Sequence, residues 1–377
     1  MTASAPEPIR TRLTDLTGIR YPIVQTGMGF VAGPRLVAAT SAAGGLGIIG
    51  SATMTVDALR AAVAEVKKRT VDPFGVNLRA DAPDAAERVE LMINAGVRVA
   101  SFALAPRRDT IQRLKDAGVI VIPSVGARRH AEKVAEWGAD AVIAQGGEGG
   151  GHTGPIPTSL LIPQLVSAVD IPVVAAGGFF DGRGLVAALA YGAEGIAMGT
   201  RFLLTTDSPV ADQVKQVYLG KTLTDTVVTT RVDGVPHRVL RTTLIEGLER
   251  SGQLAGLLRA ARNAAGFRKL SGLSWLELIR QGHAMRQATD LSWSQVLMAA
   301  NTPMLLKAAM VDGRPDLGVM AAGQVVGLID DVPSCAELID RIMTEAHDCL
   351  ARLTKLSEPG LSRPGPPRSS SAYRRLS

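Results

Sequence analysis

Residues 173–203, VVAAGGFFDGRGLVAALAYGAEGIAMGTRFL, contain the repeating unit that decides the fold. An apolar run and two glycines lead into a helix-like stretch, and Gly192 then precedes a second apolar run. A left-handed glycine that ends a helix just before a strand is the usual helix-to-strand connection. A glycine also stands between a helix-like stretch and an apolar run at Gly96, Gly118 and Gly138, so we predict a chain of repeated βα units.

Eight apolar runs with little alternation make up this series. They span residues 21–28, 45–50, 74–78, 97–103, 119–125, 139–146, 171–178 and 195–201. Such runs are typical of parallel strands buried on both faces, and amphipathic stretches such as 55–69 and 108–118 separate them. Their starts lie about 20 to 32 residues apart, which is the length of one βα unit. We therefore predict a (β/α)8 TIM barrel rather than an open doubly wound sheet.

The run GLGIIG, residues 45–50, matches the G-x-G-x-x-G pattern of dinucleotide-binding folds. That fingerprint must follow a strand and open a helix. Here the preceding residues 34–44 look helical, and the run itself looks like a strand. We therefore interpret it as a buried strand of small residues and reject a Rossmann fold.

The alternation of apolar runs and amphipathic stretches ends after the eighth run. We predict four segments: the barrel over residues 1–208, a helical insertion without clear strands over 209–315, C-terminal helices that return to the barrel over 316–356, and a disordered basic tail over 357–377. The tail is rich in Pro and Ser and has few apolar residues, which is the composition of a segment without a core.

Composition excludes several classes of protein. No apolar run reaches the ~18 residues that a membrane span needs, and the N-terminus lacks the apolar core of a signal peptide, so we expect a cytoplasmic protein. The net charge is +6, and four Arg against one Glu in the tail supply +3 of it. We expect a solvated tail and predict neither a nucleic-acid nor a membrane partner. Cys335 and Cys349 are expected to be free thiols.

The stretch AQGGEGGGHTG, residues 144–154, leaves the sixth predicted strand and has six glycines around His152. Glycine costs about 0.5–1 kcal/mol relative to alanine where ordinary dihedral angles suffice. The run therefore favours close approach of backbone to a ligand, although a flexible surface loop is the alternative. Because active sites of such barrels lie at the carboxyl ends of the strands, His152 is the candidate catalytic residue.

Two glycine turns after the seventh and eighth strands predict a phosphate site. Gly177 and Gly178 end one strand, and Gly199 with Thr200 ends the next. Exposed N–H groups at this position bind phosphate in many barrels, and the alternative is that these are only tight turns.

A phosphate there would place the rest of a cofactor over the barrel mouth. Gly27 and Met28 after the first strand, Asn77 after the third and Gln145 after the sixth would then surround a flat ring, as a flavin requires. No Lys ends a strand to form a Schiff base. The remaining histidines share no ligand spacing, so we predict no metal site and expect surface or packing roles for His130, His237, His283 and His347.

Together these motifs resemble the nitronate monooxygenase (2-nitropropane dioxygenase) family of FMN-dependent barrels. The resemblance implies FMN contacts from Gly27, Met28, Asn77, Gln145 and Gly150, with phosphate contacts from Gly177, Gly178, Gly199 and Thr200. It also implies that His152 faces the reactive edge of the flavin. Related groups include NAD(P)H:quinone reductases and flavin-dependent enoyl-[acyl carrier protein] reductases. Ser124 stands where several quinone reductases have a Lys, which argues against that subgroup.

The expected function is oxidation of alkyl nitronates, or of propionate-3-nitronate, by FMN and O2. A neutral imidazole at His152 would accept a proton α to a nitro group or hydrogen-bond a nitronate. The alternatives are an NAD(P)H-dependent reductase of quinones or enoyl thioesters and a barrel that binds without catalysis. The sequence does not distinguish a monomer from a dimer.

Overall fold

The computed structural model describes residues 5–103, 105–250 and 301–357. Eight parallel strands close into a barrel in chain order, because the last of them pairs with the first. They are β1 (Ile23–Gln25), β2 (Leu46–Gly50), β3 (Phe74–Leu78), β4 (Val99–Phe102), β5 (Ile120–Val125), β6 (Val142–Gln145), β8 (Val173–Ala176) and β9 (Ile196–Met198). Each of the eight predicted runs contains one strand, which confirms the predicted TIM barrel.

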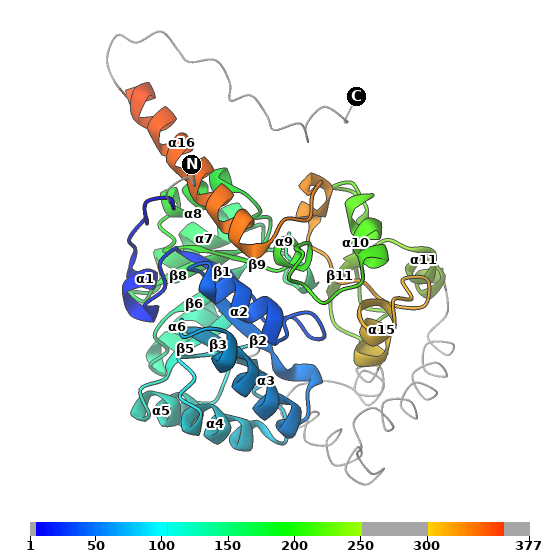
Figure 1. Cartoon of the computed structure of the whole chain (residues 1–377), viewed down its shortest axis with the longest axis horizontal. Helices are drawn as coiled ribbons and strands as arrows, with labels where there is room; N and C mark the ends of the chain where they lie inside the picture. Colours follow the sequence, from blue (N-terminus) through cyan, green and yellow to red (C-terminus); the bar gives the residue numbers. More distant parts are fainter. Residues whose placement is uncertain (1–4, 104, 251–300, 358–377) are drawn as a thin grey trace.

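Helices cover the outside of the barrel (Figure 1). They are α2 (Pro34–Ala42), α3 (Val56–Arg69), α4 (Ala85–Asn94), α5 (Arg108–Asp116), α6 (Arg128–Glu136), α7 (Thr158–Val166), α8 (Gly182–Ala190) and the short α9 (Thr200–Leu203). The four predicted connecting glycines, Gly96, Gly118, Gly138 and Gly192, have φ of 63°, 74°, 97° and 88°. These left-handed values confirm their role, since side chains with a Cβ rarely adopt them.

The barrel interior is filled by an apolar cluster. It draws one face from seven of the strands and includes Val24, Ile48, Val99, Ile122, Ile143, Val174 and Ala197. Leu13 of α1 (Arg12–Thr17), the helix that precedes β1, is also fully buried in this cluster. The interior is therefore packed with side chains, and the carboxyl ends of the strands remain to carry a site.

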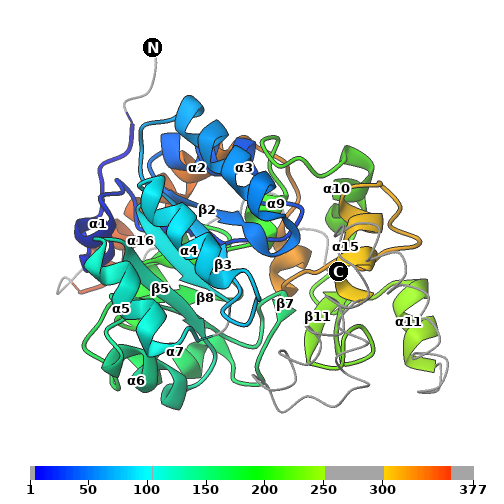
Figure 2. The same ribbon diagram turned by 90° about the horizontal axis from the view of Figure 1, so that it is seen from below.

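The segment after β9 contains strands, so the predicted strand-free insertion is wrong. β10 (Thr226–Thr229) and β11 (His237–Leu240) form an antiparallel pair, and β11 also pairs with β7 (Gly151–His152). Each strand has at most four residues, so the helical patterns around them dominate the sequence signal. Helices α10 (Asp212–Leu219), α11 (Thr243–Arg250) and α15 (Asn301–Met310) lie beside this small sheet (Figures 1 and 2).

The chain returns to the barrel after α15. The 3-10 helix η2 (Gln324–Leu328) precedes the long α16 (Cys335–Ser357), which packs against α8 and α2 (Figure 1). Cys335 is buried and Cys349 half-buried, both as free thiols. The predicted tail lies outside the described residues apart from Ser357, as do residues 251–300 of the insertion. Within the described ranges, no helix combines the length and apolar character needed to cross a bilayer.

Candidate active site

A layer of polar side chains lies inside the barrel at the carboxyl ends of the strands. Side chains alternate between the two faces of a strand. Because Val99, Ile122 and Ile143 point into the interior cluster, the residues two positions later also point inward. These are Ser101, Ser124 and Gln145. Asn77 joins them, since its amide Nδ2 donates to Ser101 Oγ at 3.2 Å. Two predicted ring contacts, Asn77 and Gln145, thus belong to one polar layer.

Glycines bring the loops of β1, β3 and β9 close together around this layer. A Cβ added at Gly27 would lie 2.4 Å from Asn77 Cβ, so only glycine fits there. A Cβ at Gly199 would lie 3.4 Å from Met28 Sδ and 3.2 Å from Thr26 Oγ1. The structure therefore brings Gly27 and Met28 together with Asn77 and Gly199.

The candidate phosphate glycines need left-handed backbone. Gly177 has φ 101° and Gly178 has φ 84°. Thr200 begins α9 directly after Gly199, and its Oγ1 accepts the N–H of Gly323 at 2.9 Å. Successive N–H groups in such turns form concave sites for anions. The arrangement can hold a phosphate.

The returning segment at Gly323 completes this side of the mouth. A Cβ at Gly150 would lie 2.6 Å from Gly323 N, and a Cβ at Gly323 would lie 3.6 Å from Thr200 Oγ1. Gly323 therefore joins two predicted contacts, Gly150 and Thr200, that are 50 positions apart. The sequence analysis missed it, because only the folded chain places residue 323 beside the barrel.

Glu148 fastens the glycine loop to the barrel. One oxygen of its carboxylate accepts both the N–H and the hydroxyl of Thr158, at 2.9 and 2.6 Å. The same hydroxyl lies 3.0 Å from the carbonyl oxygen of Gly177. Glu148 and Thr158 thus link the glycine loop to the first turn of α7 and to the candidate phosphate turn. The sequence analysis named neither residue.

Gln145 also supports the glycine loop. Its Nε2 donates to the carbonyl of His152 at 2.8 Å and to that of Gly150 at 3.4 Å. Gln145, which the sequence predicts as a flavin contact, thus has its amide nitrogen engaged with the loop, and it positions that loop beside the polar layer.

His152 lies on β7, in register with His237 on β11. Its side chain is 60% exposed, and its Nε2 lies 2.7 Å from Asp233 Oδ2. His237 Nδ1 approaches the same oxygen at 3.3 Å, and the two imidazole centroids are 4.6 Å apart. Burial alone would raise the pKa of Asp233, but the hydrogen bonds from the two histidines outweigh it and hold that pKa well below its ordinary value.

His237, for which the sequence predicted a surface or packing role, lies in a cluster with His152 and Asp233. One ligand atom each from His152, Asp233 and His237 lies within 4.8 Å of the others, which is close enough for a shared metal ion. Pairing of β7 with β11 creates this cluster, and that pairing is invisible in the chain order. The stretch DGVPH, residues 233–237, carries the only local signal, a turn between an Asp and a His.

The donors at this mouth fit a flavin phosphate. Left-handed Gly177 and Gly178 end β8, and a Cβ added at Gly178 would meet nothing closer than 3.6 Å, so space remains beside that turn. Polar side chains line one side, and the exposed imidazole lies on the loop between β6 and α7. The group would be held by backbone far more than by charged side chains.

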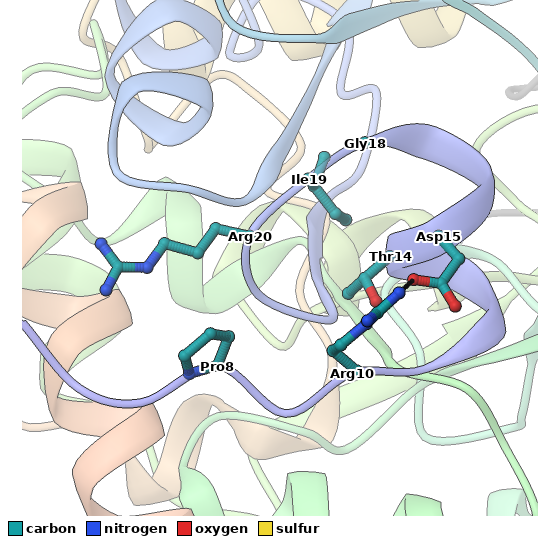
Figure 3. Close-up of a pocket in the computed structure, with 7 residues that line it drawn as sticks. All are labelled: Pro8, Arg10, Thr14, Asp15, Gly18, Ile19 and Arg20. Atoms are coloured by element: carbon teal, nitrogen blue, oxygen red, sulfur yellow. Dashed lines mark hydrogen bonds and ion pairs between the residues drawn. The ribbon is translucent and has the colours of Figure 1, made fainter.

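A hollow of about 380 Å³ lies at the opposite end of the barrel (Figure 3). Gly18, Ile19 and Arg20 line it just before β1 begins, and Arg10 pairs with Asp15 at its edge at 2.8 Å. Both partners of that ion pair are mostly exposed. Since barrel chemistry belongs to the carboxyl ends of the strands, we assign the hollow no part in it.

Comparison with known proteins agrees with the geometry. The nitronate monooxygenase family profile matches residues 10–345. The chain is 63% identical over 353 residues to the (3aS,4S,5R,7aS)-5-hydroxy-7a-methyl-1-oxo-octahydro-1H-indene-4-carboxyl-CoA dehydrogenase of Mycobacterium tuberculosis, covering 93% of this chain and 99% of that one. It is 34% identical over 284 residues to a probable nitronate monooxygenase of Staphylococcus saprophyticus, covering 63% of this chain and 80% of that one.

A solved structure shares the architecture. FabK from Thermotoga maritima superposes with a TM-score of 0.74 at 36% identity, covering 92% of this chain and 99% of that one. The matched profile spans the barrel, the small sheet and the N-terminal part of α16. The chain therefore belongs to the nitronate monooxygenase family, a family of flavin-dependent oxidoreductases.

Proposed function

We propose that this protein is an FMN-dependent dehydrogenase of a CoA thioester. The observation that carries the proposal is an exposed imidazole, His152, held on a glycine loop at the mouth of a flavin-type barrel. The M. tuberculosis relative named as a carboxyl-CoA dehydrogenase, identical at 63% of positions, supports the choice of substrate. The proposal replaces nitronates with thioesters as first candidate and keeps the same candidate base.

The residues proposed to hold FMN are those of the mouth. Gly177, Gly178, Gly199 and Thr200 would bind the phosphate, while Asn77, Gln145 and the backbone of Gly27, Met28 and Gly150 would surround the ring. The sequence has no separate fingerprint for an adenine nucleotide, which favours FMN over FAD. When bound, the flavin supplies the two-electron acceptor that a dehydrogenation needs.

His152 is the proposed base for the carbon α to the thioester carbonyl. Within the described residues its Nδ1 makes no hydrogen bond, while Nε2 faces Asp233. A thioester carbonyl acidifies the neighbouring C–H much as a nitro group does, so a positioned imidazole can take that proton. The substrate loses this proton to Nδ1 and a hydride from the β carbon, and a carbon–carbon double bond forms.

Nitronate oxidation by O2 is the second candidate function. The matched family profile and the S. saprophyticus relative both support it. The same base would act on the carbon α to a nitro group. The two candidates differ in the substrate that delivers electrons to the flavin. They also differ in the acceptor that takes electrons from the flavin, which we propose to be NAD(P)+ for the thioester and O2 for the nitronate.

Anaerobic reduction of the bound flavin tests the proposal. The purified protein should release FMN on denaturation, and its absorbance should bleach with an alicyclic carboxyl-CoA thioester, with or without a ring hydroxyl. Product analysis should find the α,β-unsaturated thioester. Bleaching by ethylnitronate alone would overturn the proposal in favour of the second candidate. Release of FAD, or purification of a protein without flavin, would remove the basis of both candidate functions.

A further inference from the structure

Asp233 and His237 form a hydrogen-bonded chain with His152 that the barrel does not supply. We infer that Asp233 is a positioning residue that fixes the His152 tautomer, with Nε2 protonated and Nδ1 left as the proton acceptor, and that His237 holds the Asp233 carboxylate in place. The inference rests on the proposed function of His152 as the base. It adds two residues of the insertion to a site built mainly from barrel loops.

The distances define the direction of the chain. An ionised carboxylate only accepts hydrogen bonds, so the imidazole nitrogens facing it must carry the protons. Nε2 of His152 lies at 2.7 Å from Asp233 Oδ2, within the range of a charge-assisted bond, and Nδ1 of His237 lies at 3.3 Å. A neutral imidazole has one protonated nitrogen. Donation from Nε2 therefore leaves Nδ1 of His152 unprotonated.

Two members of the chain are buried and the third is exposed. The side chains of Asp233 and His237 are each 4% exposed, while that of His152 is 60% exposed. The carboxylate is thus shielded from water, and a hydrogen bond to it is stronger in this environment than it would be in water. Only the outermost member, His152, can meet a substrate. An exposed imidazole that is hydrogen-bonded to a buried carboxylate is the arrangement expected of a positioned base.

The turn between β10 and β11 fixes Asp233 itself. Val232 is fully buried in the apolar cluster of the insertion, so the turn cannot swing freely. The N–H of Val235 points to Asp233 Oδ1 at 3.4 Å, and Gly234 adopts φ 86° to close the turn. The N–H of Thr153 donates to the carbonyl of Pro236 at 3.3 Å. The backbone therefore ties the turn that carries Asp233 to Thr153, the residue after His152.

The other charged groups near the chain have partners of their own. Arg238, next to His237 on β11, donates from Nε and Nη2 to the carbonyl of Gly147 at 3.1 and 2.8 Å. Glu148 on the glycine loop accepts from Thr158. Among the described residues, Asp233 is therefore the carboxylate that contacts His152, and its lowered pKa agrees with an ionised acceptor.

The three side chains also have the spacing of a metal site, which is a different use of the same atoms. A bound metal would need both facing imidazole nitrogens unprotonated, and it would occupy the position of the two hydrogen bonds. The 2.7 Å contact between His152 Nε2 and Asp233 Oδ2 is a hydrogen-bond distance. We therefore favour the hydrogen-bonded chain and make the metal an outcome of the test.

The test reads the His152 tautomer directly by NMR of the full-length holoprotein with ¹⁵N-labelled histidine. The chain has five histidines, and the His152→Gln variant assigns the signal of His152 by its loss. Wild type should show Nε2 protonated and Nδ1 unprotonated. In Asp233→Asn the signal should move to a mixture of tautomers. The matched control is Asp225→Asn, since Asp225 lies just before β10 and its carboxylate binds Thr222.

Turnover and metal content complete the test. With a thioester that reduces the flavin, Asp233→Asn should lower kcat about 10²-fold or more, with KM and FMN content within about twofold of wild type. Asp233→Glu keeps the carboxylate, so its kcat should lie between those of Asp233→Asn and wild type. If Asp233→Asn does not fold, the kcat of Asp233→Glu serves as the test.

Two results would overturn the inference. One is an unchanged His152 tautomer with normal kcat in Asp233→Asn, and the other is stoichiometric zinc that a chelator removes together with activity. The NMR measurement needs no substrate. Failure of every thioester to reduce the flavin would therefore count against the proposed function and leave the tautomer result to stand or fall separately.

Discussion

His152 Nε2 and Asp233 Oδ2 lie 2.7 Å apart, although 81 positions separate the two residues in the chain. The first belongs to a loop of the barrel and the second to the turn between β10 and β11. Pairing of β7 with β11 joins these two parts of the chain at the site. The barrel thus contributes the candidate cofactor cradle, and the insertion contributes the support of the candidate base.

We expect His152→Gln to retain FMN, because the candidate phosphate contacts lie elsewhere. It should lower kcat/KM about 10²-fold or more, as loss of a general base does. The matched control is His347→Gln, since His347 lies on α16 and its Nε2 contacts the carbonyl of Glu7. If the nitroalkane candidate is correct, the loss should be larger with a neutral nitroalkane than with its preformed nitronate, because only the former must lose a proton. Normal turnover with every substrate would show that His152 is not the base.

The barrel could be predicted because its signals are local. Each strand is a short apolar run, and several helices end at a left-handed glycine that is recognisable in the sequence without knowledge of the fold. GLGIIG illustrates this, since its strand-like residues and helical predecessor decided against a dinucleotide site. β2 (Leu46–Gly50) after α2 (Pro34–Ala42) confirms that interpretation.

The small sheet and part of the site could not be predicted, because they depend on contacts between distant segments. β7 has two residues and becomes a strand only by pairing with β11. His237 therefore looked like an isolated histidine. Gly323 likewise gains its place beside Gly150 and Thr200 only when the chain returns to the barrel. Short elements carry too little periodicity to reveal such pairings.

Gly178→Ala should weaken FMN binding more than it weakens the fold. Gly178 has φ 84°, and an added Cβ would lie 3.6 Å from Glu148 Cβ, so the strain comes from the backbone rather than from a clash. Left-handed backbone costs a residue with a Cβ about 1–2 kcal/mol. We expect a similar loss of stability in Gly118→Ala, where φ is 74° and nothing lies within 4 Å of the added Cβ.

Gly118 lies just before β5, at the end of the barrel away from the candidate site. Only Gly178→Ala should therefore lower FMN affinity, by about tenfold or more, which is about 1.4 kcal/mol. Chemical denaturation compares the stabilities, and flavin titration of the apoprotein compares the affinities. Equal FMN affinities in the two variants would remove Gly178 from the phosphate site.

Thr158→Val should loosen the glycine loop. The substitution keeps the shape of the side chain and removes the hydroxyl that contacts Glu148 at 2.6 Å and the carbonyl of Gly177 at 3.0 Å. A hydrogen bond to a charged group contributes about 1.5–3 kcal/mol, so the free energy of unfolding should fall by about that amount. Thr158→Ser keeps the hydroxyl and should stay near wild type. Matching stabilities in the two variants, measured by urea unfolding, would contradict the role given to this hydroxyl.

Asp233→Asn should change how the stability of the protein depends on acid. Hydrogen bonds from His152 and His237 outweigh burial and hold the pKa of Asp233 in the folded state well below its ordinary value of about 3.9. As the pH falls through about 4, the unfolded chain takes up a proton at Asp233 that the folded protein does not, and unfolding becomes more favourable. The stabilisation is therefore complete above about pH 5 and is lost progressively below about pH 4. Because Asn takes up no proton, the free energy of unfolding of wild type should fall more steeply than that of Asp233→Asn as the pH is lowered below about 4. Urea unfolding across this range measures the two slopes. A variant that lost stability as steeply as wild type would mean that the Asp233 carboxylate is not held ionised by its two histidines, and the chain of hydrogen bonds behind His152 would then lose its electrostatic basis.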